Sequence, residues 1–409
     1  MATTSSSSEA SKPQIIKLKD FFVYSNILHL TIGMKAYATE TQLTKWRSML
    51  LHASFISQLI ILNIVLLGQI LFVIVAINNG SNFVEATLNI AIFSFGIVGN
   101  VKIAYIYMQH AHISSVVDCL QELHPQTLEL QVEYRVEHYL RSFTGMCKFY
   151  CGMHLILAWT YNLYWAVYYL IMDLWLGKVS YVRMLPYYSW TPWDYQHNWS
   201  YYPTYIAQNL AAQYCFAGQL ATDMLLLALA TLMVMHFERL GLRLEQHVAG
   251  VCAKRDIRFL QSCIAYHQRL LLLCEDINKI FGISLLCNFG SSCGIICFVI
   301  FQLTVGGQLD TLLMLLLFLI CAMVQIILIG NHAQRLINAS EQIGQAIYNH
   351  DWFNANLQYR KLMLQIMIRS QSACYLKATP FLPISHITVA SLFQLSYKFF
   401  ALVRSMYAQ

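Results

Sequence analysis

Runs of apolar residues, each nearly free of charge over a length that can cross a lipid bilayer, recur along this 409-residue chain. A helix needs about 20 such residues to span the hydrocarbon core, and seven stretches meet that requirement. They cover residues 48–77, 83–108, 144–172, 203–236, 280–304, 309–330 and 379–403. The sequence therefore predicts an all-α membrane protein with seven transmembrane helices.

Little of the chain remains for a separate soluble domain, since 57% of its residues are hydrophobic and only 11% are charged. Soluble chains usually carry about 25% charged residues. Two segments between spans mix charge with helical periodicity, so we expect them to be cytoplasmic helical anchor segments. The predicted organisation is a cytoplasmic segment at 1–47, spans one to four at 48–236, an anchor segment at 237–279, spans five and six at 280–330, an anchor segment at 331–376, and the seventh span within 377–409.

The orientation follows from the basic residues, which accumulate on cytoplasmic loops because their translocation is unfavourable. Most of the 26 Lys and Arg residues fall before the first span or in alternate loops after it. The opposite loops hold only Lys178 and Arg183. We therefore predict a cytoplasmic N-terminus and, after seven spans, an extracellular C-terminus. Sequons at Asn79 and Asn198 lie in the loops assigned to the outside, and both are predicted to be glycosylated.

The fourth apolar run continues past the length of a membrane span. No proline interrupts the chain between Pro203 and His247, and about 45 helical residues would extend roughly 68 Å. The helix is therefore predicted to project into the cytosol. The external loop before it, residues 181–205, is rich in Tyr, Trp and Pro, which fits either a structured cap or an aromatic belt without a binding role.

The sequence contains none of the common catalytic arrangements: no glycine-rich phosphate loop, no nucleophile elbow and no helix with two histidines four residues apart. We therefore expect neither an enzyme nor a cofactor. The formal net charge of +6 could indicate nucleic acid, but the basic residues do not cluster with stacking aromatics in a soluble segment. The composition therefore predicts that membrane lipid, not nucleic acid, surrounds this chain.

Two ionisable residues lie inside predicted spans, where charge is costly. Asp223 is expected either to have a gating or coupling role or to be a satisfied carboxylate that faces the helix bundle. Lys102, near the inner end of the second span, is expected to extend its ammonium to the interface.

The last span carries a polar stripe. Small or polar residues recur at helical spacing together with two leucines, at Ser385, Thr388, Ser391, Leu395, Lys398, Leu402 and Ser405. Such a stripe must face protein or water. It could line a pore shared by several subunits, or it could serve helix packing within one chain.

Residues suited to a small and mostly apolar ligand lie in the outer halves of spans two, three, four and six. They are Phe93, Trp159, Tyr161, Tyr205, Gln208 and Met314. Ordinary packing between helices is the alternative role for each of them.

Several stretches of the chain resemble the insect odorant receptor family. They are the long helix with Asp223, Met224 and 236–239, the loop 185–194, the stretch 275–282, and the C-terminal residues Ala346–Tyr348, Asp351, Trp352, Arg360, Lys361, 369–371, 376–378, 383–385 and 396–402. The similarity covers nearly the whole chain after the N-terminal tail.

The resemblance implies an odorant-specific subunit of a heteromeric, ligand-gated, non-selective cation channel that small volatile odorants open. Its partner would be the shared odorant receptor co-receptor, in a tetramer in the plasma membrane of olfactory neurons. In that family the last helix lines the pore and the anchor segments form the assembly core. By position, Leu402 and Met406 would lie at the hydrophobic gate, with Ser405 beside them.

Other classes remain open at this point. A gustatory-type receptor channel usually carries a Thr-Tyr start and a Gln-Phe ending in its last span, a pattern that is absent here. A G-protein-coupled receptor would have the opposite orientation. A transporter built from inverted repeats is disfavoured, because the chain has neither internal symmetry nor a pair of broken helices.

Overall fold

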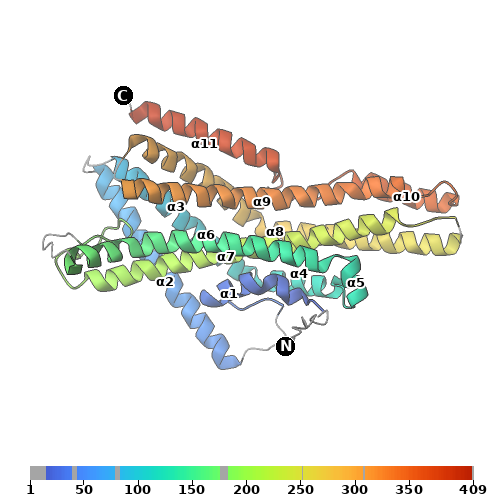
Figure 1. Ribbon diagram of the computed structural model, residues 1–409, viewed down its shortest axis with the longest axis horizontal. Coiled ribbons are helices and arrows are strands. Elements are labelled where there is room, and N and C mark those ends of the chain that lie inside the picture. The colour runs from blue at the N-terminus through green and yellow to red at the C-terminus, as the bar shows by residue number, and fades with distance from the viewer. Residues whose placement is uncertain are drawn as a thin grey trace, which may run out of the picture.

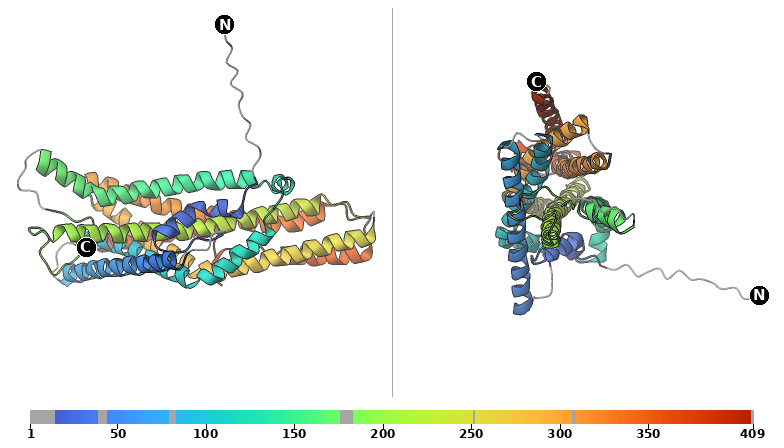
Figure 2. Two further views of the ribbon diagram at one scale, coloured as in Figure 1. Left: turned by 90° about the horizontal axis from the view of Figure 1, so that it is seen from below. Right: turned by 90° about the vertical axis from the view of Figure 1, so that its left-hand side faces the viewer.

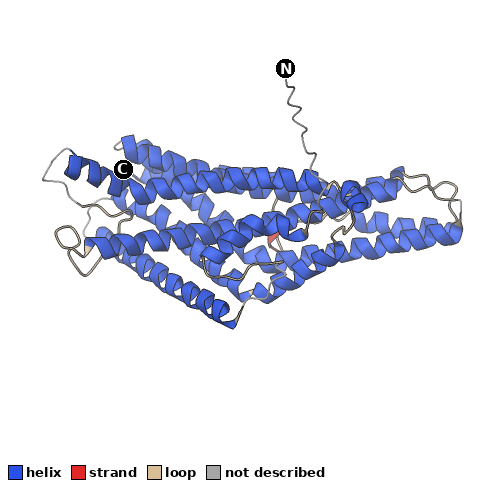
Figure 3. Ribbon diagram, turned by 60° about the horizontal axis from the view of Figure 1, so that its bottom comes forward, coloured by secondary structure: helices blue, strands red, loops and turns tan. Residues whose placement is uncertain are grey.

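The apolar runs form long α-helices that lie roughly along one axis (Figures 1 and 3). The computed structural model describes residues 15–38, 44–78, 83–175, 183–250, 252–306 and 309–407. The α-helices are α1 (Val23–Thr31), α2 (Lys45–Asn78), α3 (Phe83–Met108), α4 (His110–Leu123), α5 (Leu128–Glu133), α6 (Val136–Tyr169), α7 (Tyr201–Glu245), α8 (Ala253–Val305), α9 (Leu309–Asn349), α10 (Leu357–Ser370) and α11 (His386–Tyr407). A 3-10 turn, Leu18–Phe22, precedes α1, and a π turn, Leu170–Trp175, follows α6.

Six helices in the described part of the chain are long and apolar enough to cross a membrane by length and composition: α2, α3, α7, α8, α9 and α11. The predicted third span, residues 144–172, lies in α6, which is 34 residues long but is not among those six. The reason is its composition, since Tyr, Trp, His and Asn side chains interrupt its apolar run. The apolar content of this helix alone therefore does not identify it as a span.

The long helix predicted from residue 203 to residue 247 is confirmed as α7, which has 45 residues. α7 lies at the centre of the bundle, where α2, α3, α6, α8 and α9 pack around it (Figure 2, right). The 18 most apolar consecutive residues of α7 are all buried. Because this helix is apolar on all sides, burial on all sides is its stable position.

α8 and α9 run without a break through the boundaries that the sequence predicts between spans and anchor segments. α8 has 53 residues and α9 has 41 residues. Beyond the predicted spans, these two helices pack with α10 and with the last turns of α7 around side chains such as Leu244, Leu260, Ile343 and Ile366. We call this end, on the right in Figure 1, the anchor end.

The last helix begins later than the sequence predicts. Lys377–Thr379 (β1) and Leu382–Pro383 (β2) pair as short antiparallel strands, so α11 begins at His386 rather than at Thr379. The backbone N–H of Lys377 donates to the Asn278 side-chain oxygen at 2.9 Å, and the Asn278 amide donates to the Tyr375 carbonyl at 2.8 Å. These bonds fix the hairpin to α8.

α11 lies at the edge of the molecule, packed on α8 and α9 (Figure 1). One stripe of this helix is buried: Val389, Leu392, Ser396 and Phe400. The predicted polar stripe points to another side, and its members Ser391, Leu395, Lys398, Leu402 and Ser405 are all exposed. Packing within this chain therefore does not explain that part of the stripe.

Candidate functional site

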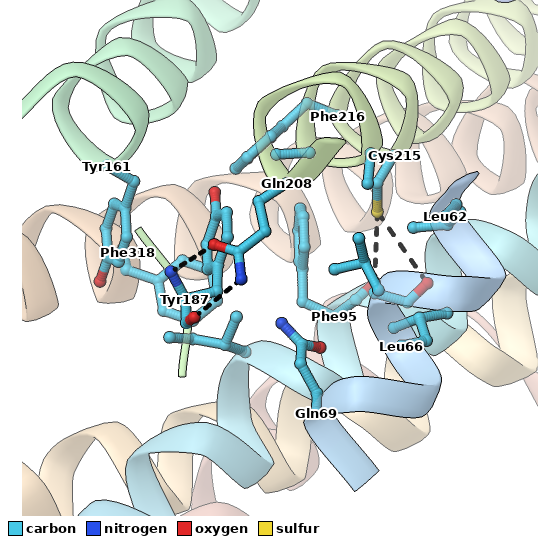
Figure 4. A pocket seen from close by; sticks show the side chains of 15 residues that line it. Leu62, Leu66, Gln69, Phe95, Tyr161, Tyr187, Gln208, Cys215, Phe216 and Phe318 are labelled. Atoms are coloured by element: carbon cyan, nitrogen blue, oxygen red, sulfur yellow. Dashed lines mark hydrogen bonds between the residues drawn. The ribbon is translucent and has the colours of Figure 1, made fainter. Parts of the chain in front are cut away.

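A pocket lies between helices (Figure 4). It is at the end of the bundle opposite the anchor end. It holds about 540 Å³ of non-atom space, its open mouth included. Its lining is mostly apolar and comes from α2, α3, α6, α7, α9 and the segment before α7. We call it the main pocket, lined by Leu62, Val65, Leu66, Gln69, Ile92, Phe95, Gly96, Tyr161, Tyr187, Gln208, Ala211, Ala212, Cys215, Phe216 and Phe318.

The segment before α7 caps the main pocket through Tyr187, which is only 7% exposed. The Gln208 side chain holds the backbone of this tyrosine from both sides. Its oxygen accepts the Tyr187 N–H at 3.2 Å, and its nitrogen donates to the Tyr187 carbonyl at 3.1 Å (Figure 4). The Tyr187 hydroxyl donates to the Asn162 side-chain oxygen at 3.0 Å. Burial raises the pKa of Tyr187, so this hydroxyl stays neutral and available as a donor.

The same segment also binds α2. The Trp190 N–H donates to the Gly68 carbonyl at 2.9 Å. A Cβ at Gly68 would lie 3.1 Å from the Trp190 carbonyl oxygen, so glycine permits this close approach. The aromatic loop is therefore a structured cap over residues 185–190, one of the two alternatives that the sequence left open.

Few polar groups face the main pocket, which limits what it can bind. Gln69 is 4% exposed, and its side-chain amide has no hydrogen-bond partner among the described residues. Tyr161 contributes a hydroxyl, and its ring packs edge-on to Phe318 with a centroid distance of 6.2 Å. An aromatic and aliphatic wall with one free amide suits a small apolar ligand with a single polar group.

A second cavity lies beyond the cap and shares Ile92, Tyr161 and Tyr187 with the main pocket. It holds about 840 Å³ of non-atom space, open parts included. Arg183, also in its lining, lies over the rings of Tyr201 and Tyr202 at 5.8 and 5.7 Å. Tyr161 and Tyr187 therefore separate the main pocket from the cavity outside it.

The structure brings together only part of the predicted ligand set. Tyr161 and Gln208 line the main pocket, and Met314 joins Tyr161 in the lining of the second cavity. Tyr205, Trp159 and Phe93 line neither cavity: the Tyr205 hydroxyl binds the Asn162 carbonyl, Trp159 is 57% exposed, and Phe93 packs against the core.

Sequence reasoning missed Gln69 and the cap residue Tyr187. A signal for Gln69 was present, because it is the one side-chain amide in the apolar run 64–77, where a polar group is costly in lipid. The position of Tyr187 had no such signal, because it depends on how a loop folds back over the helices.

Replacing Gln208 by leucine should loosen the cap. Both polar groups of the Tyr187 backbone would lose their partner, and each buried unsatisfied group costs about 1–3 kcal/mol. We expect faster proteolysis within residues 183–200 and a weaker response to ligand, measured by limited proteolysis and by dose-response curves. Asn209→Leu is the matched control, because the Asn209 side chain binds only within its own helix. Equal protease sensitivity of the two variants would contradict the cap.

A buried ion pair lies deeper in the bundle, between the main pocket and the anchor end. The Lys102 ammonium of α3 lies 2.6 Å from the Asp223 carboxylate of α7, with exposures of 0% and 2%. The prediction that Lys102 extends to the interface is therefore wrong. The expectation of a satisfied carboxylate at Asp223 is correct in geometry, since three neutral side chains also donate to it: Asn288 at 3.3 Å, Gln325 at 2.6 Å and Tyr150 at 3.2 Å.

The predicted gate residues lie together near the end of α11. Leu402 and Met406 are 55% and 68% exposed, and Ser405 is also exposed. The predicted glycosylation site Asn198 is exposed just before α7, where its backbone carbonyl accepts from Arg183 at 3.2 Å. The other predicted site, Asn79, lies outside the described residues.

Comparison with known proteins identifies the family of this chain. The family model described as 7tm odorant receptor matches residues 82–397. The chain is 54% identical over 405 residues to "Putative odorant receptor 85d" and 37% identical over 386 residues to "Odorant receptor 85b", both from Drosophila melanogaster. These alignments cover 99% and 94% of this chain and 98% of each relative.

A solved structure has the same fold. The insect olfactory receptor OR5 from Machilis hrabei, in complex with eugenol, matches with a TM-score of 0.78 over 95% of this chain and 97% of that chain, at 14% identity. This structural match shows the fold alone. The family model and the two Drosophila relatives show the family to which the chain belongs. The chain is therefore a multi-pass membrane protein that belongs to the insect odorant receptor family, a family of receptors rather than enzymes, and is one of its odorant-specific members.

Proposed function

We propose that this chain is the odorant-binding subunit of a heteromeric, ligand-gated, non-selective cation channel, which it forms with the odorant receptor co-receptor. The observation that carries the proposal is the main pocket, a mostly apolar site capped by Tyr187. Its free Gln69 amide suits a small volatile molecule with one oxygen-bearing group. The similar OR5 structure was solved in complex with the small molecule eugenol.

The proposed orientation places the main pocket in the outer half of the membrane and the anchor end in the cytosol. In it α6 is the third of seven spans, the N-terminus is cytoplasmic and the C-terminus is extracellular. The bundle supports α6 as a span: it packs along α7 and α9, both of which are apolar enough to cross a membrane. Its Tyr and Trp side chains suit positions at the interface. The proposed location is the plasma membrane of olfactory neurons.

Helix α9 offers a route from the pocket to the pore. Phe318 lines the main pocket, and two turns further on Gln325 donates to Asp223. One turn beyond that, a Cβ at Gly330 would lie 2.5 Å from a methyl group of Val389 in α11. A single helix therefore contacts the main pocket, the buried ion pair and the proposed pore helix, so a shift of α9 on ligand binding would move α11.

The exposed stripe of α11 supports the pore assignment. In a tetramer the stripes of several subunits would face a common axis, with Leu402, Ser405 and Met406 at the gate. Lys398 is unfavourable in a cation pathway, so co-receptor subunits are expected to supply most of the conducting surface.

Whole-cell recording tests the function. In cells that express this chain with the co-receptor, we expect a subset of a broad odorant panel to evoke a current whose reversal potential is unchanged when Na⁺ is replaced by K⁺. Cells with the co-receptor alone provide the baseline. Silence across the panel, despite the chain at the cell surface, would overturn the proposal.

Glycan mapping tests the orientation separately. Asn198→Gln should reduce the glycosidase-sensitive shift in mobility by one glycan, because Asn198 is exposed in a loop proposed to face outward. Asn338→Gln, which removes the sequon in the proposed cytoplasmic part of α9, should change nothing. A glycan at Asn338 would reverse the orientation.

A further inference from the structure

A third cavity, which we call the side cavity, lies between α6, α7, α9 and the first residue of α11. It holds about 910 Å³ of non-atom space, its open side included. It shares no lining residue with the main pocket or with the second cavity. Its α9 residues begin at Leu328, ten positions beyond Phe318 toward the anchor end.

The lining of the side cavity changes from apolar to polar along both of its long walls. Toward the pocket end of the molecule the walls are Phe143 and Met146 of α6 and Leu328 of α9. Toward the anchor end they become His138 of α6, and Arg335 and Asn338 of α9. At 1.5 Å per residue, Leu328 and Asn338 are about 15 Å apart along the helix. This polarity matches an amphiphile that lies parallel to the helices.

The polar part of the side cavity favours an anion. Arg335 is exposed and makes no ion pair or hydrogen bond with the described residues. No acidic side chain belongs to the lining. Its Tyr139 and Thr231 hydroxyls already donate to Glu238 and to the Leu227 carbonyl, whereas the amide nitrogens of Asn331 and Asn338 donate to no described residue. Glu238 lies outside the lining, where its carboxylate accepts the Tyr139 hydroxyl, so its charge is behind that side chain rather than in the cavity. An unpaired guanidinium beside neutral donors is the usual chemistry of a phosphate site.

We propose that the side cavity binds the phosphate headgroup of an anionic phospholipid from the cytoplasmic leaflet, with Arg335 on the phosphate and an acyl chain along Phe143, Met146 and Leu328. This assignment rests on the proposed orientation, which puts the anchor end in the cytosol. Basic pockets between helices on that side are suited to anionic headgroups. Free phosphate would satisfy the same donors but would leave the apolar end of the cavity unfilled.

The bound lipid would contact the residues that fix the start of the pore helix. The His386 ring donates to the Asn331 side-chain oxygen at 2.9 Å, and the His386 backbone N–H donates to the Gln334 side-chain oxygen at 3.3 Å. All three residues line the side cavity. Lipid in this site would therefore act on the junction between α9 and α11.

Photolabelling of the intact complex tests the site. The chain would be purified with the co-receptor and placed in phosphatidylcholine nanodiscs that contain a photoreactive phosphatidylserine, and the labelled peptides would be mapped by mass spectrometry. We expect label within residues 138–146 and 328–338. Arg335→Gln should lower it about fivefold or more, since one basic residue near the surface contributes about that factor in affinity.

Two variants and one competitor distinguish a specific lipid site from general surface attraction and from a site for free phosphate. Arg335→Lys keeps the charge and should retain most of the label. Arg141→Gln removes an exposed arginine of α6 that does not line the cavity, and it should leave the label within about twofold. Equal loss in Arg141→Gln and Arg335→Gln would mean general surface attraction and would overturn the site.

Inorganic phosphate should not displace the lipid label, and complete displacement would assign the cavity to free phosphate instead. An absence of label in both segments would also overturn the proposal. Labelling needs no odorant, so a complex that labels here but gives no odorant current would contradict the proposed function and leave this inference standing.

Discussion

Replacing Asp223 by alanine should destabilise the protein by about 3–5 kcal/mol, the usual cost of removing one partner from a buried ion pair. The Lys102 ammonium is fully buried, and its only other acceptor among the described residues is the Asn288 side-chain oxygen at 3.2 Å. A nearly unpaired ammonium would remain inside the bundle. We expect little folded protein at the cell surface and a lower unfolding temperature for the purified complex.

Lys102→Met is the matched variant, and it should cost clearly less. The Asp223 carboxylate would still accept from Asn288, Gln325 and Tyr150, so its charge would remain hydrogen-bonded. The unfolding temperatures of the two variant complexes measure the difference in stability. Each is obtained by heating the fluorescently labelled complex and quantifying the intact fraction by size-exclusion chromatography. An equal loss, or a larger loss for Lys102→Met, would contradict the assigned roles of these four partners.

Replacing Ala212 by phenylalanine should strongly weaken the odorant response. Ala212 lines the main pocket and is 9% exposed, so an aromatic ring at this position would occupy the space proposed for ligand. Overpacking typically costs 1–3 kcal/mol. Because that cost falls on the bound state, the half-maximal concentration should rise about 5- to 150-fold. Dose-response curves with the best wild-type odorant measure the shift.

Leu210→Phe provides the control for the pocket. It adds a ring to the same helix two residues earlier, but Leu210 is 48% exposed and does not line the pocket. This variant should respond like the wild type. An unchanged dose-response curve for Ala212→Phe, at equal surface expression, would exclude the main pocket as the ligand site.

The sequence predicted the elements that depend on local composition. The 45-residue length of α7 followed from an uninterrupted run between Pro203 and a charged end. The start of α11 was predicted too early, because hydropathy counted Thr379–Ile384 as part of the span. Two prolines and the hydrogen bonds of Asn278 instead make this stretch a hairpin on α8.

The buried ion pair could not be found from local pattern. Lys102 and Asp223 are 121 positions apart in the sequence. Each had a separate explanation: Lys102 as a residue near the membrane interface, and Asp223 as a carboxylate that faces the helix bundle. Only the rotation of α3 against α7 brings them together. Hydropathy carries no information on that rotation, because both helices are apolar on most sides.

The pocket was predicted in part for the same reason. The sequence indicated the correct helices and two of the lining residues, Tyr161 and Gln208. It selected Phe93 where the structure places Phe95, two positions along α3, which turns the side chain to a different face of the helix. The contribution of α2 and the closure by Tyr187 depend on tertiary contacts.

A cryo-electron microscopy map of the complex with the co-receptor, bound to an odorant that activates it, tests whether the main pocket is the ligand site. We expect odorant density in the main pocket between Phe95, Phe216 and Phe318, beneath Tyr187, with the oxygen of the ligand near Gln69 or Tyr161. An empty main pocket, with the odorant bound elsewhere on this chain or only on the co-receptor, would contradict it.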